Sequence, residues 1–188
     1  MKKEDEPKIC PVEKAGGLDN SIRKFLQNPQ RLLMAFIKPG MTVLDVGCGP
    51  GFFTVEISKM LANSGKVIAA DLQEGMLDII RQKIKGTALE QRVELHKCKP
   101  DRIDLSEKVD FVLAFYMIHE LPSKENALRE LKTLLNPQGQ ILIIEPKGHV
   151  TKKSFNAMTE LAQEIGFNVS AGPKVFFSRS VILTPITS

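Results

Sequence analysis

The sequence predicts an α/β protein with a mostly parallel sheet whose two faces are covered by helices. Short apolar runs alternate with stretches of helical periodicity, and two final extended runs follow each other without a helix between them. Strands that alternate with helices form parallel sheets that are buried on both faces. The chain has 188 residues, of which 43% are hydrophobic and 26% charged, so one globular domain can bury a substantial core.

Five apolar runs that contain β-branched residues predict the parallel strands. These runs are Met41–Val46, Val67–Ala70, Val93–Leu95, Phe111–Phe115 and Ile141–Ile144. Two further extended runs lie within Phe167–Thr184, on either side of Gly172 and Pro173. Because no helix separates them, we expect a hairpin that gives a seven-stranded sheet an antiparallel carboxyl-terminal edge.

Four stretches repeat apolar residues at helical spacing and predict amphipathic helices. They are Phe52–Leu61, Glu74–Ile84, Ser123–Leu135 and Ser154–Ile165. Ser123 is expected to cap the third helix, with Asn126 at its third helical position, and Pro137 and Gly139 should end it. Gly166 is expected to end the fourth helix.

The amino-terminal part of the chain differs from this repeat. Residues 1–16 are predicted to be a flexible charged arm, followed by a helix from about Asn20 to Ile37 that is interrupted near Pro29. Such a helix can lie over the carboxyl edge of the sheet. We therefore divide the chain into an arm with a cap helix, residues 1–37, and the principal domain, residues 38–188.

Charge, hydropathy and cysteine content restrict the possible partners. Lysines and arginines are spread along the chain, with a net charge of only +4, so we expect no nucleic-acid partner. The amino terminus lacks the apolar segment of a secretory signal, and the longest apolar run, Phe111–Ile118, is too short for membrane insertion. Three widely spaced cysteines, Cys10, Cys48 and Cys98, favour a cytoplasmic location.

The segment from Val43 to Phe52, VLDVGCGPGF, carries the most informative motif. Its three alternate glycines follow an apolar strand and precede a helix, so the backbone can approach a ligand where side chains would clash. The motif differs from the dinucleotide fingerprint, because Phe52 stands at the place of the third glycine. It also lacks the lysine of a phosphate-binding P-loop. We expect this loop to hold a ligand.

An acidic residue follows the next predicted strand. Asp71 stands directly after Val67–Ala70, where a carboxylate can accept both hydroxyls of a ribose, so the expected ligand is a nucleoside. With these features, the chain from about Asn20 to Leu183 resembles the class I S-adenosylmethionine-dependent methyltransferases, especially the small-molecule branch that includes the ubiquinone and menaquinone methylating enzymes. The resemblance implies a three-layer Rossmann-like fold and S-adenosylmethionine as the cofactor.

The resemblance also implies how the cofactor is held. The ammonium of its methionine portion would be received by Asp45 and by carbonyls of the glycine loop. Asp71 would bind the ribose, and Leu72 would lie against the adenine, although a leucine there is equally compatible with the core. The residues implied around the methionine portion are Asp45, Gly47, Cys48, Gly49 and Gly51.

Two later segments complete this implied cofactor site. Lys99 and Pro100 stand where the family often carries an acidic and a small residue facing the adenine amino group, and Asp101 is the nearest acid. After the fourth strand, Phe115 and Tyr116 correspond to the position that flanks the sulfonium and the acceptor. Either aromatic residue can instead serve packing alone.

Histidines and glutamates near the ends of two strands are the remaining candidates for chemistry. His119 and Glu120 follow the fourth strand, and Glu145 and His149 follow the fifth, so neighbouring strands would bring them to one rim of the pocket. His119 is the candidate catalytic base, and bracing of its loop is the structural alternative. The four residues lack a known metal-ligand spacing, and we expect no metal.

The sequence therefore predicts methyl transfer to a small-molecule acceptor. Ala114–Met117 lacks the Asn/Asp-Pro-Pro-aromatic motif of enzymes that methylate amino groups of DNA bases. A methyltransferase-like protein that binds the nucleoside as a sensor ligand or structural plug would carry the same glycine loop and Asp71. Modification of a protein or RNA partner is a third alternative, for which the sequence shows no appended recognition domain. Thiol chemistry such as arsenite methylation would involve Cys48 together with Cys10 and Cys98. Neither the acceptor nor the oligomeric state is specified by these motifs.

Overall fold

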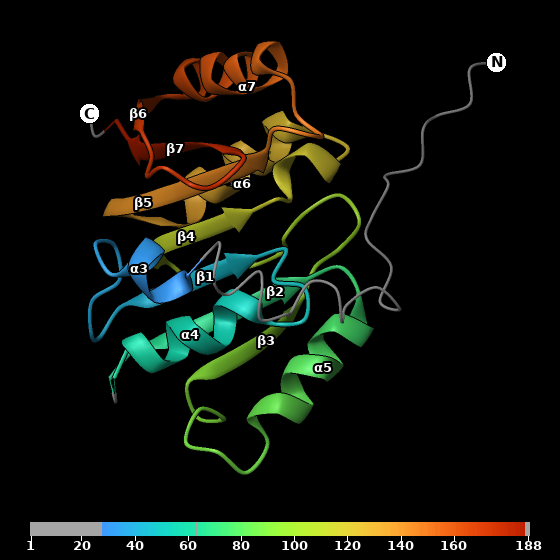
Figure 1. The fold of residues 1–188 in the computed structure, drawn as a ribbon, viewed down its shortest axis with the longest axis vertical. Helices are drawn as coiled ribbons and strands as arrows, with labels where there is room; N and C mark the ends of the chain where they lie inside the picture. Colours follow the sequence, from blue (N-terminus) through green and yellow to red (C-terminus); the bar gives the residue numbers. More distant parts are fainter. Residues whose placement is uncertain (1–27, 63, 187–188) are drawn as a thin grey trace, which may run out of the picture.

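The structure, a computed structural model, describes residues 28–62 and 64–186. Within them, seven strands form one sheet in the order β3-β2-β1-β4-β5-β7-β6 (Figure 1). The strands are β1 Thr42–Val46, β2 Lys66–Asp71, β3 Val93–Lys97, β4 Val109–Phe115, β5 Leu135–Pro146, β6 Phe167–Ala171 and β7 Ser178–Pro185.

The sheet is parallel from β3 to β5 and antiparallel at its carboxyl-terminal edge. β1 lies between β2 and β4 and is parallel to both, and β4 is parallel to β5. β7 runs antiparallel to β5 on one side and to β6 on the other. The predicted parallel sheet and hairpin edge are confirmed, and β7 enters between β5 and β6 rather than forming the outermost strand.

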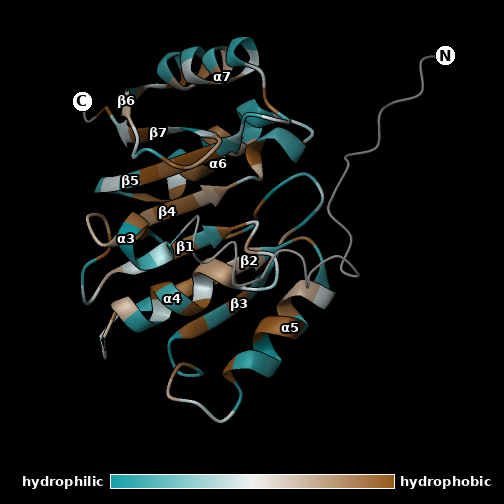
Figure 2. Ribbon diagram, viewed as in Figure 1, coloured by the Kyte–Doolittle hydropathy of each residue, from teal (hydrophilic) through white to brown (hydrophobic). Residues whose placement is uncertain are grey.

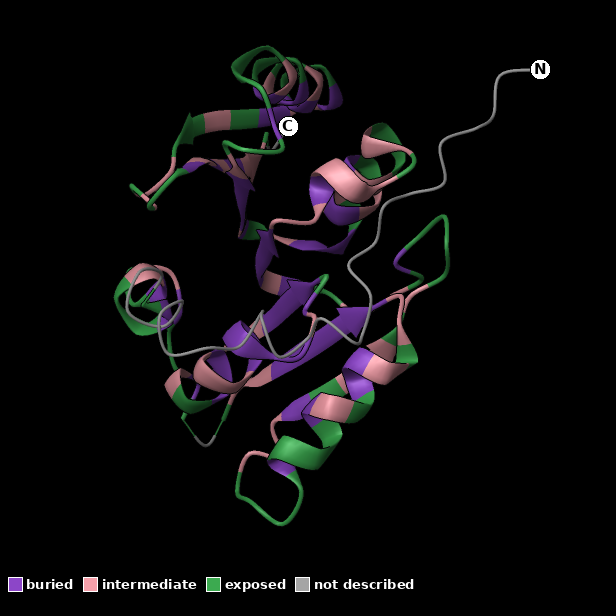
Figure 3. Cartoon of the chain, turned by 45° about the vertical axis from the view of Figure 1, so that its right-hand side comes forward, coloured by how far each residue is buried: buried purple, intermediate pink, exposed green. Residues whose placement is uncertain are grey.

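Helices cover both faces of this sheet and make it the middle of three layers. α3 (Pro29–Leu33), α4 (Phe52–Met60) and α5 (Glu74–Ile84) share one apolar core with one face, whereas α6 (Lys124–Leu134) and α7 (Lys152–Ile165) share the other core. Figure 2 shows that much of β4 and β5 is hydrophobic, whereas α7 on the outside is mainly hydrophilic. All but one residue of each of β1, β2 and β4 is buried (Figure 3), as expected for parallel strands covered on both faces.

Capping interactions explain where the two later helices begin and end. The side chain of Ser123 accepts a hydrogen bond from the backbone N–H of Asn126 at 3.2 Å, which confirms the predicted cap of α6. Thr151 caps α7, so that helix begins two residues before its predicted start. Gly166 ends α7 in the left-handed conformation, at φ +95°, as predicted.

The expected loop after α6 is part of a strand. α6 ends at Leu134, and β5 begins at the next residue, so Pro137 and Gly139 lie in the irregular first part of β5, where its register with β4 shifts. Asn136 donates a hydrogen bond to the Asp110 carboxylate at 2.6 Å and ties this segment to β4. An irregularity of this kind tolerates a proline within a strand.

Only the last part of the predicted amino-terminal helix lies within the described residues. α3 begins at Pro29, after the capping residue Asn28, and ends at Leu33, so it does not continue to Ile37. The ring of Phe36 stacks on Phe111 at a centroid distance of 5.5 Å, which places this segment near the beginning of β4 rather than at the carboxyl edge. Residues 20–27 lie outside the described residues, and the domain boundary at residue 37 stays a prediction.

No helix within residues 28–62 and 64–186 is long and apolar enough to cross a membrane.

Candidate active site

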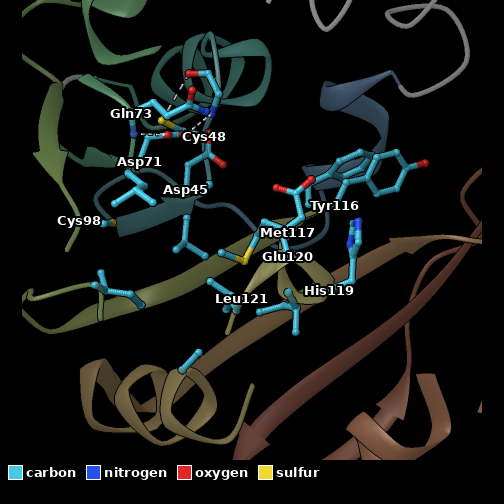
Figure 4. Close-up of a pocket in the computed structure, with 18 of the residues that line it drawn as sticks. Asp45, Cys48, Asp71, Gln73, Cys98, Tyr116, Met117, His119, Glu120 and Leu121 are labelled. Carbon is cyan, nitrogen blue, oxygen red and sulfur yellow. Dashed lines mark hydrogen bonds between the residues drawn. The ribbon is translucent and has the colours of Figure 1, made fainter. Parts of the chain in front are cut away.

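A cavity of about 430 Å³ opens where the parallel strands end (Figure 4). It lies beside the carboxyl ends of β1, β2 and β4, which are adjacent in the sheet. The chain leaves β1 and β4 toward opposite sides, and this point of an open α/β sheet is where ligands bind. Its walls include the glycine loop, the turn after β2, residues 98–103, residues 115–123, Pro146 at the end of β5, and His149.

Asp45 supplies a buried carboxylate at the floor of the cavity. It is 2% exposed, and the Thr54 hydroxyl of α4 donates a hydrogen bond to its Oδ2 at 2.6 Å. Since α4 begins directly after the glycine loop, this hydrogen bond links the first strand to the helix that follows the loop. The carboxylate that the resemblance assigned to the cofactor's ammonium is therefore held in a defined orientation, although Thr54 was not singled out from the sequence.

The glycine loop is held over β2 by its backbone. The N–H groups of Gly47 and Cys48 both donate to the carbonyl of Ala70, at 2.8 and 3.1 Å. Gly47 has φ +68°, and a side chain there would meet Met117 at 2.7 Å. Gly49 has φ +53°, but a side chain there would find nothing within 4 Å. Gly47 is thus needed for close packing, whereas Gly49 borders open space that a ligand can fill.

Gly51 has a different role from the other predicted loop residues. Asp45, Gly47, Cys48 and Gly49 line the cavity, but Gly51 does not. It caps α4 in the left-handed conformation, and a side chain there would meet Ile80 of α5 at 2.7 Å. Gly51 allows α4 and α5 to pack closely and supports the loop from outside the cavity.

Asp71 joins the glycine loop to the turn after β2. Its Oδ2 accepts a hydrogen bond from the Gly49 N–H at 2.9 Å, and its Oδ1 accepts one from the Gln73 N–H at 2.8 Å. Burial raises the pKa of Asp71, while these backbone N–H groups act in the opposite direction. A carboxylate has about four acceptor positions, so hydroxyl groups can still bind beside the two backbone donors.

The residues predicted to surround the adenine also reach the cavity. Leu72, Lys99 and Pro100 all line it. The Lys99 ammonium forms an ion pair with Asp104 at 2.8 Å, and the Lys99 backbone N–H donates to the carbonyl of Arg102 at 2.9 Å. Because the Lys99 ammonium is paired with Asp104, it is mainly the backbone of Lys99 that shapes this wall of the cavity.

Two thiols lie in the same wall. Cys48 and Cys98 are free cysteines that line the cavity. Burial raises the pKa of Cys48 well above its usual value and that of Cys98 to about 12. Both groups are therefore protonated at neutral pH and behave as small apolar residues rather than as nucleophiles.

The rings of Phe53, Phe115 and Tyr116 form an aromatic wall along the cavity. The ring centroids of Phe53 and Phe115 lie 4.4 Å apart, and those of Phe115 and Tyr116 lie 4.2 Å apart. Tyr116 adopts φ +60°, an unusual conformation for a bulky residue. Its hydroxyl is hydrogen bonded to that of Ser178 at 2.6 Å, which connects the end of β4 to β7.

His119 and Glu145 form a hydrogen-bonded pair beyond this wall. His119 Nδ1 lies 2.5 Å from Glu145 Oε2, and the His119 backbone N–H donates to Oε1 at 3.3 Å. The His149 ring lies edge-on to His119 at a centroid distance of 5.6 Å. The hydrogen bond from Glu145 raises the pKa of His119, although partial burial opposes this shift. His119, Glu120 and His149 line the cavity as predicted, whereas Glu145 is buried beside His119 and does not line it.

Within the part of the chain that the structure describes, no group of three or more His, Cys, Asp or Glu residues is arranged to hold a metal ion.

Comparison with known proteins agrees with the fold and the cavity. Residues 37–175 match the methyltransferase domain family. A solved S-adenosylmethionine-dependent methyltransferase from Aquifex aeolicus is 31% identical, with a TM-score of 0.83, and the match covers 93% of this chain and 98% of that one. A TehB-like S-adenosylmethionine-dependent methyltransferase from Corynebacterium glutamicum shares the fold at 21% identity, with a TM-score of 0.69 over 92% of this chain and 93% of that one.

A curated relative matches over a shorter segment. The ubiquinone/menaquinone biosynthesis C-methyltransferase UbiE of Escherichia fergusonii is 30% identical over 110 residues, which are 58% of this chain and 44% of the relative. The chain thus spans less than half the length of the curated relatives that it matches.

The fold and the site together define a Rossmann-like, class I methyltransferase domain. The chain belongs to the S-adenosylmethionine-dependent methyltransferase family, and S-adenosylmethionine is the cofactor. Its cavity fits that molecule, because two carboxylates, Asp45 and Asp71, flank a glycine loop with open space above Gly49.

Proposed function

We propose that the protein transfers the methyl group of S-adenosylmethionine to a small-molecule acceptor that binds beside His119. The observation that carries this proposal is the continuity of one cavity, which extends from Asp45 and Asp71 to the His119–Glu145 pair. A donor and an acceptor held in one cavity of about 430 Å³ can be aligned without an extended recognition surface.

The chain's own residues would align the reactants and exclude water. Asp45 would receive the ammonium of the cofactor, Asp71 its ribose hydroxyls, and Leu72 and Pro100 would lie against its adenine. S-adenosylmethionine supplies an electrophilic methyl group on a sulfonium. Phe115 and Tyr116 would shield the reacting atoms, so that the acceptor approaches in line with few competing water molecules.

His119 is the proposed base for acceptors that must lose a proton. Its Nδ1 faces Glu145, which leaves Nε2 as the ring nitrogen that can take the acceptor's proton. Glu145 would act as a positioning residue, because it holds both the ring and the backbone of His119. The arrangement of a base oriented by a carboxylate is typical of general base catalysis.

The relatives and the charge distribution support a small acceptor. UbiE is named for ubiquinone and menaquinone biosynthesis, which concerns small molecules. The positive charges spread along this chain do not favour a nucleic-acid substrate. The free thiols of Cys48 and Cys98 agree with a cytoplasmic location, where thiols remain reduced.

The test measures cofactor binding and turnover separately. S-adenosylhomocysteine should bind with one-to-one stoichiometry in calorimetry, and tritium from labelled S-adenosylmethionine should enter compounds in the ultrafiltrate of a cell extract. Transfer only into the retained macromolecules would contradict the small acceptor. Binding with no transfer to either fraction would favour a nucleoside-binding protein without turnover. The Gly49→Val variant, which we expect not to bind the cofactor, is the control for background transfer.

A further inference from the structure

Glu120 is a carboxylate at the acceptor end of the cavity that the mechanism above does not use. It ends the short 3-10 helix η2 (Ile118–Glu120) and lines the cavity in a half-buried position. Figure 4 shows its carboxylate directed into the cavity, on the side of Tyr116. Among the described residues, no hydrogen-bond donor or cation is paired with this carboxylate, whereas Asp45, Asp71 and Glu145 each have a partner.

The charges around Glu120 leave this end of the cavity negative. His119 is the cation that acts on Glu120, but its hydrogen bond goes to Glu145, so that pair compensates itself. The two basic residues of the cavity wall, Lys99 and Arg102, form ion pairs with Asp104. Burial, Glu145 and Asp71 all raise the pKa of Glu120, and only His119 opposes them. The carboxylate thus lacks the cation that a partly buried charge normally acquires.

We propose that Glu120 binds the methyl acceptor and that this acceptor is an amine. The inference rests on the proposed function and narrows its substrate class. An ammonium group would supply both the missing charge and hydrogen-bond donors to Glu120, in the charge-assisted geometry that is strongest in a partly dry site. A carboxylate or phenolate acceptor would instead be repelled by Glu120, and the charges of Asp71 and Glu145 act in the same direction.

The residues present can account for each proton and electron pair in methyl transfer to an amine. The bound ammonium first loses one proton to the neutral form of His119, from which it passes to solvent. The nitrogen lone pair then forms the new bond to the methyl carbon while the bond between that carbon and sulfur breaks, and its electron pair stays on the sulfur. The products are a methylated amine, which regains a positive charge, and S-adenosylhomocysteine.

Matched ligands of one shape and different charge test the inference without requiring turnover. Calorimetry on protein saturated with S-adenosylhomocysteine would compare 2-phenylethylamine with 2-phenylethanol and 3-phenylpropionate, and tryptamine with tryptophol and indole-3-propionate. In at least one of the two series, the amine should bind at least about tenfold more tightly than both the alcohol and the carboxylate. Glu120→Gln should remove this preference, and Glu120→Lys should shift it toward the carboxylate.

Glu125→Gln is the matched control, because Glu125 lies nearby on α6, is exposed and pairs with Arg129 instead of facing the cavity. It should keep the preference for amines. Equal binding of amines and carboxylates, binding of neither amine, or a preference that survives in Glu120→Gln would each overturn the inference. Loss of S-adenosylhomocysteine affinity in Glu120→Gln with an unchanged ligand preference would assign Glu120 to the cofactor instead.

The same titrations separate this inference from the proposed function. Wild-type protein that binds S-adenosylhomocysteine but no amine contradicts the amine acceptor alone. Wild-type protein that does not bind S-adenosylhomocysteine contradicts the proposed function itself.

Discussion

Single residues in this site serve the fold and the ligand at once, and Asp71 is the clearest case. The position of Asp71 after a strand predicts a ribose ligand, but no sequence pattern indicates that its two oxygens already accept the N–H groups of Gly49 and Gln73. Those contacts depend on how two loops meet. A substitution at Asp71 therefore changes both the ribose contact and the shape of the glycine loop.

We predict that Asp71→Ala weakens S-adenosylhomocysteine binding by about 1.5–3 kcal/mol, the loss expected for hydrogen bonds to a charged group. Calorimetry with the 2′,3′-dideoxy analogue separates the two effects. If Asp71 binds the ribose hydroxyls, the substitution should cost this analogue clearly less affinity than it costs S-adenosylhomocysteine, because only the effect on the loop remains. An equal loss for both ligands would show that Asp71 only shapes the loop, and circular dichroism would verify that the variant is folded.

His119 was predicted to stand at the rim, and the adjacency of β4 and β5 was enough to predict Glu145 beside it. The contact between Nδ1 and Oε2 was not predictable, because it depends on side-chain rotamers. It changes the expected pH dependence. Since Glu145 raises the pKa of His119, the ring keeps its proton to a higher pH than the usual value of about 6.5.

If His119 is the base, the wild-type rate with an authentic acceptor should rise with pH through a value above 6.5. Glu145→Gln should move this rise in rate to lower pH, because the neutral amide no longer stabilises the protonated ring of His119. His119→Ala should lower the rate about a hundredfold or more and leave the affinity for S-adenosylhomocysteine unchanged. A small loss of rate that does not vary with pH would show that His119 only stabilises its loop and is not the base.

At the scale of elements, the predictions succeeded where a local pattern is sufficient. Glu74–Ile84 was predicted with the bounds that α5 has, and the core of each parallel strand was found. The beginning of β5 was missed because Pro137 and Gly139 are local signals for a loop, whereas the contact between Asn136 and Asp110 is a tertiary one. The place of β7 between β5 and β6 depends likewise on pairing between distant residues.

The glycine loop offers a matched pair of substitutions at this scale. Gly49→Val places its side chain in open space, so the cost to the fold is limited to the strain of φ +53°, but the space for the cofactor is filled. We predict that it abolishes S-adenosylhomocysteine binding in calorimetry while helix content is retained. Gly47→Val would meet Met117 at 2.7 Å and should lower the melting temperature more strongly. A Gly49→Val protein that binds the cofactor normally would remove this loop from the site.

At the scale of the whole molecule, one cavity concentrates charge that the rest of the core avoids. The buried polar residues among those described are few, and both Asp45 and Asp71 lie at this cavity. The hydrogen bonds that Asp45 and Asp71 accept offset most of the free-energy cost of burying their carboxylates. Glu120 accepts no such hydrogen bond from the described residues. A site kept ready for a ligand in this way commonly lowers the stability of the free protein.

We therefore predict that Glu120→Gln stabilises the protein without ligand at neutral pH. The folded-state pKa of Glu120 lies above its unfolded value of about 4.5, so its contribution to stability is present below pH 4.5 and is lost as pH rises through the folded pKa. Because Glu120 is only half-buried, we expect a gain on substitution of about 0.5 kcal/mol, within the range of solvent-screened charges. For a chain of this length it corresponds to a rise in melting temperature of about 1–2 °C.

Thermal unfolding followed by circular dichroism at neutral pH and near pH 4 measures this effect against the control Glu125→Gln. The gain should be visible at neutral pH and should disappear near pH 4, where wild-type Glu120 is itself protonated. Glu125→Gln removes an exposed ion pair with Arg129 and should change the melting temperature little at either pH. A Glu120→Gln protein that is less stable than the wild type at neutral pH would mean that the carboxylate already stabilises the fold and is not held for a ligand.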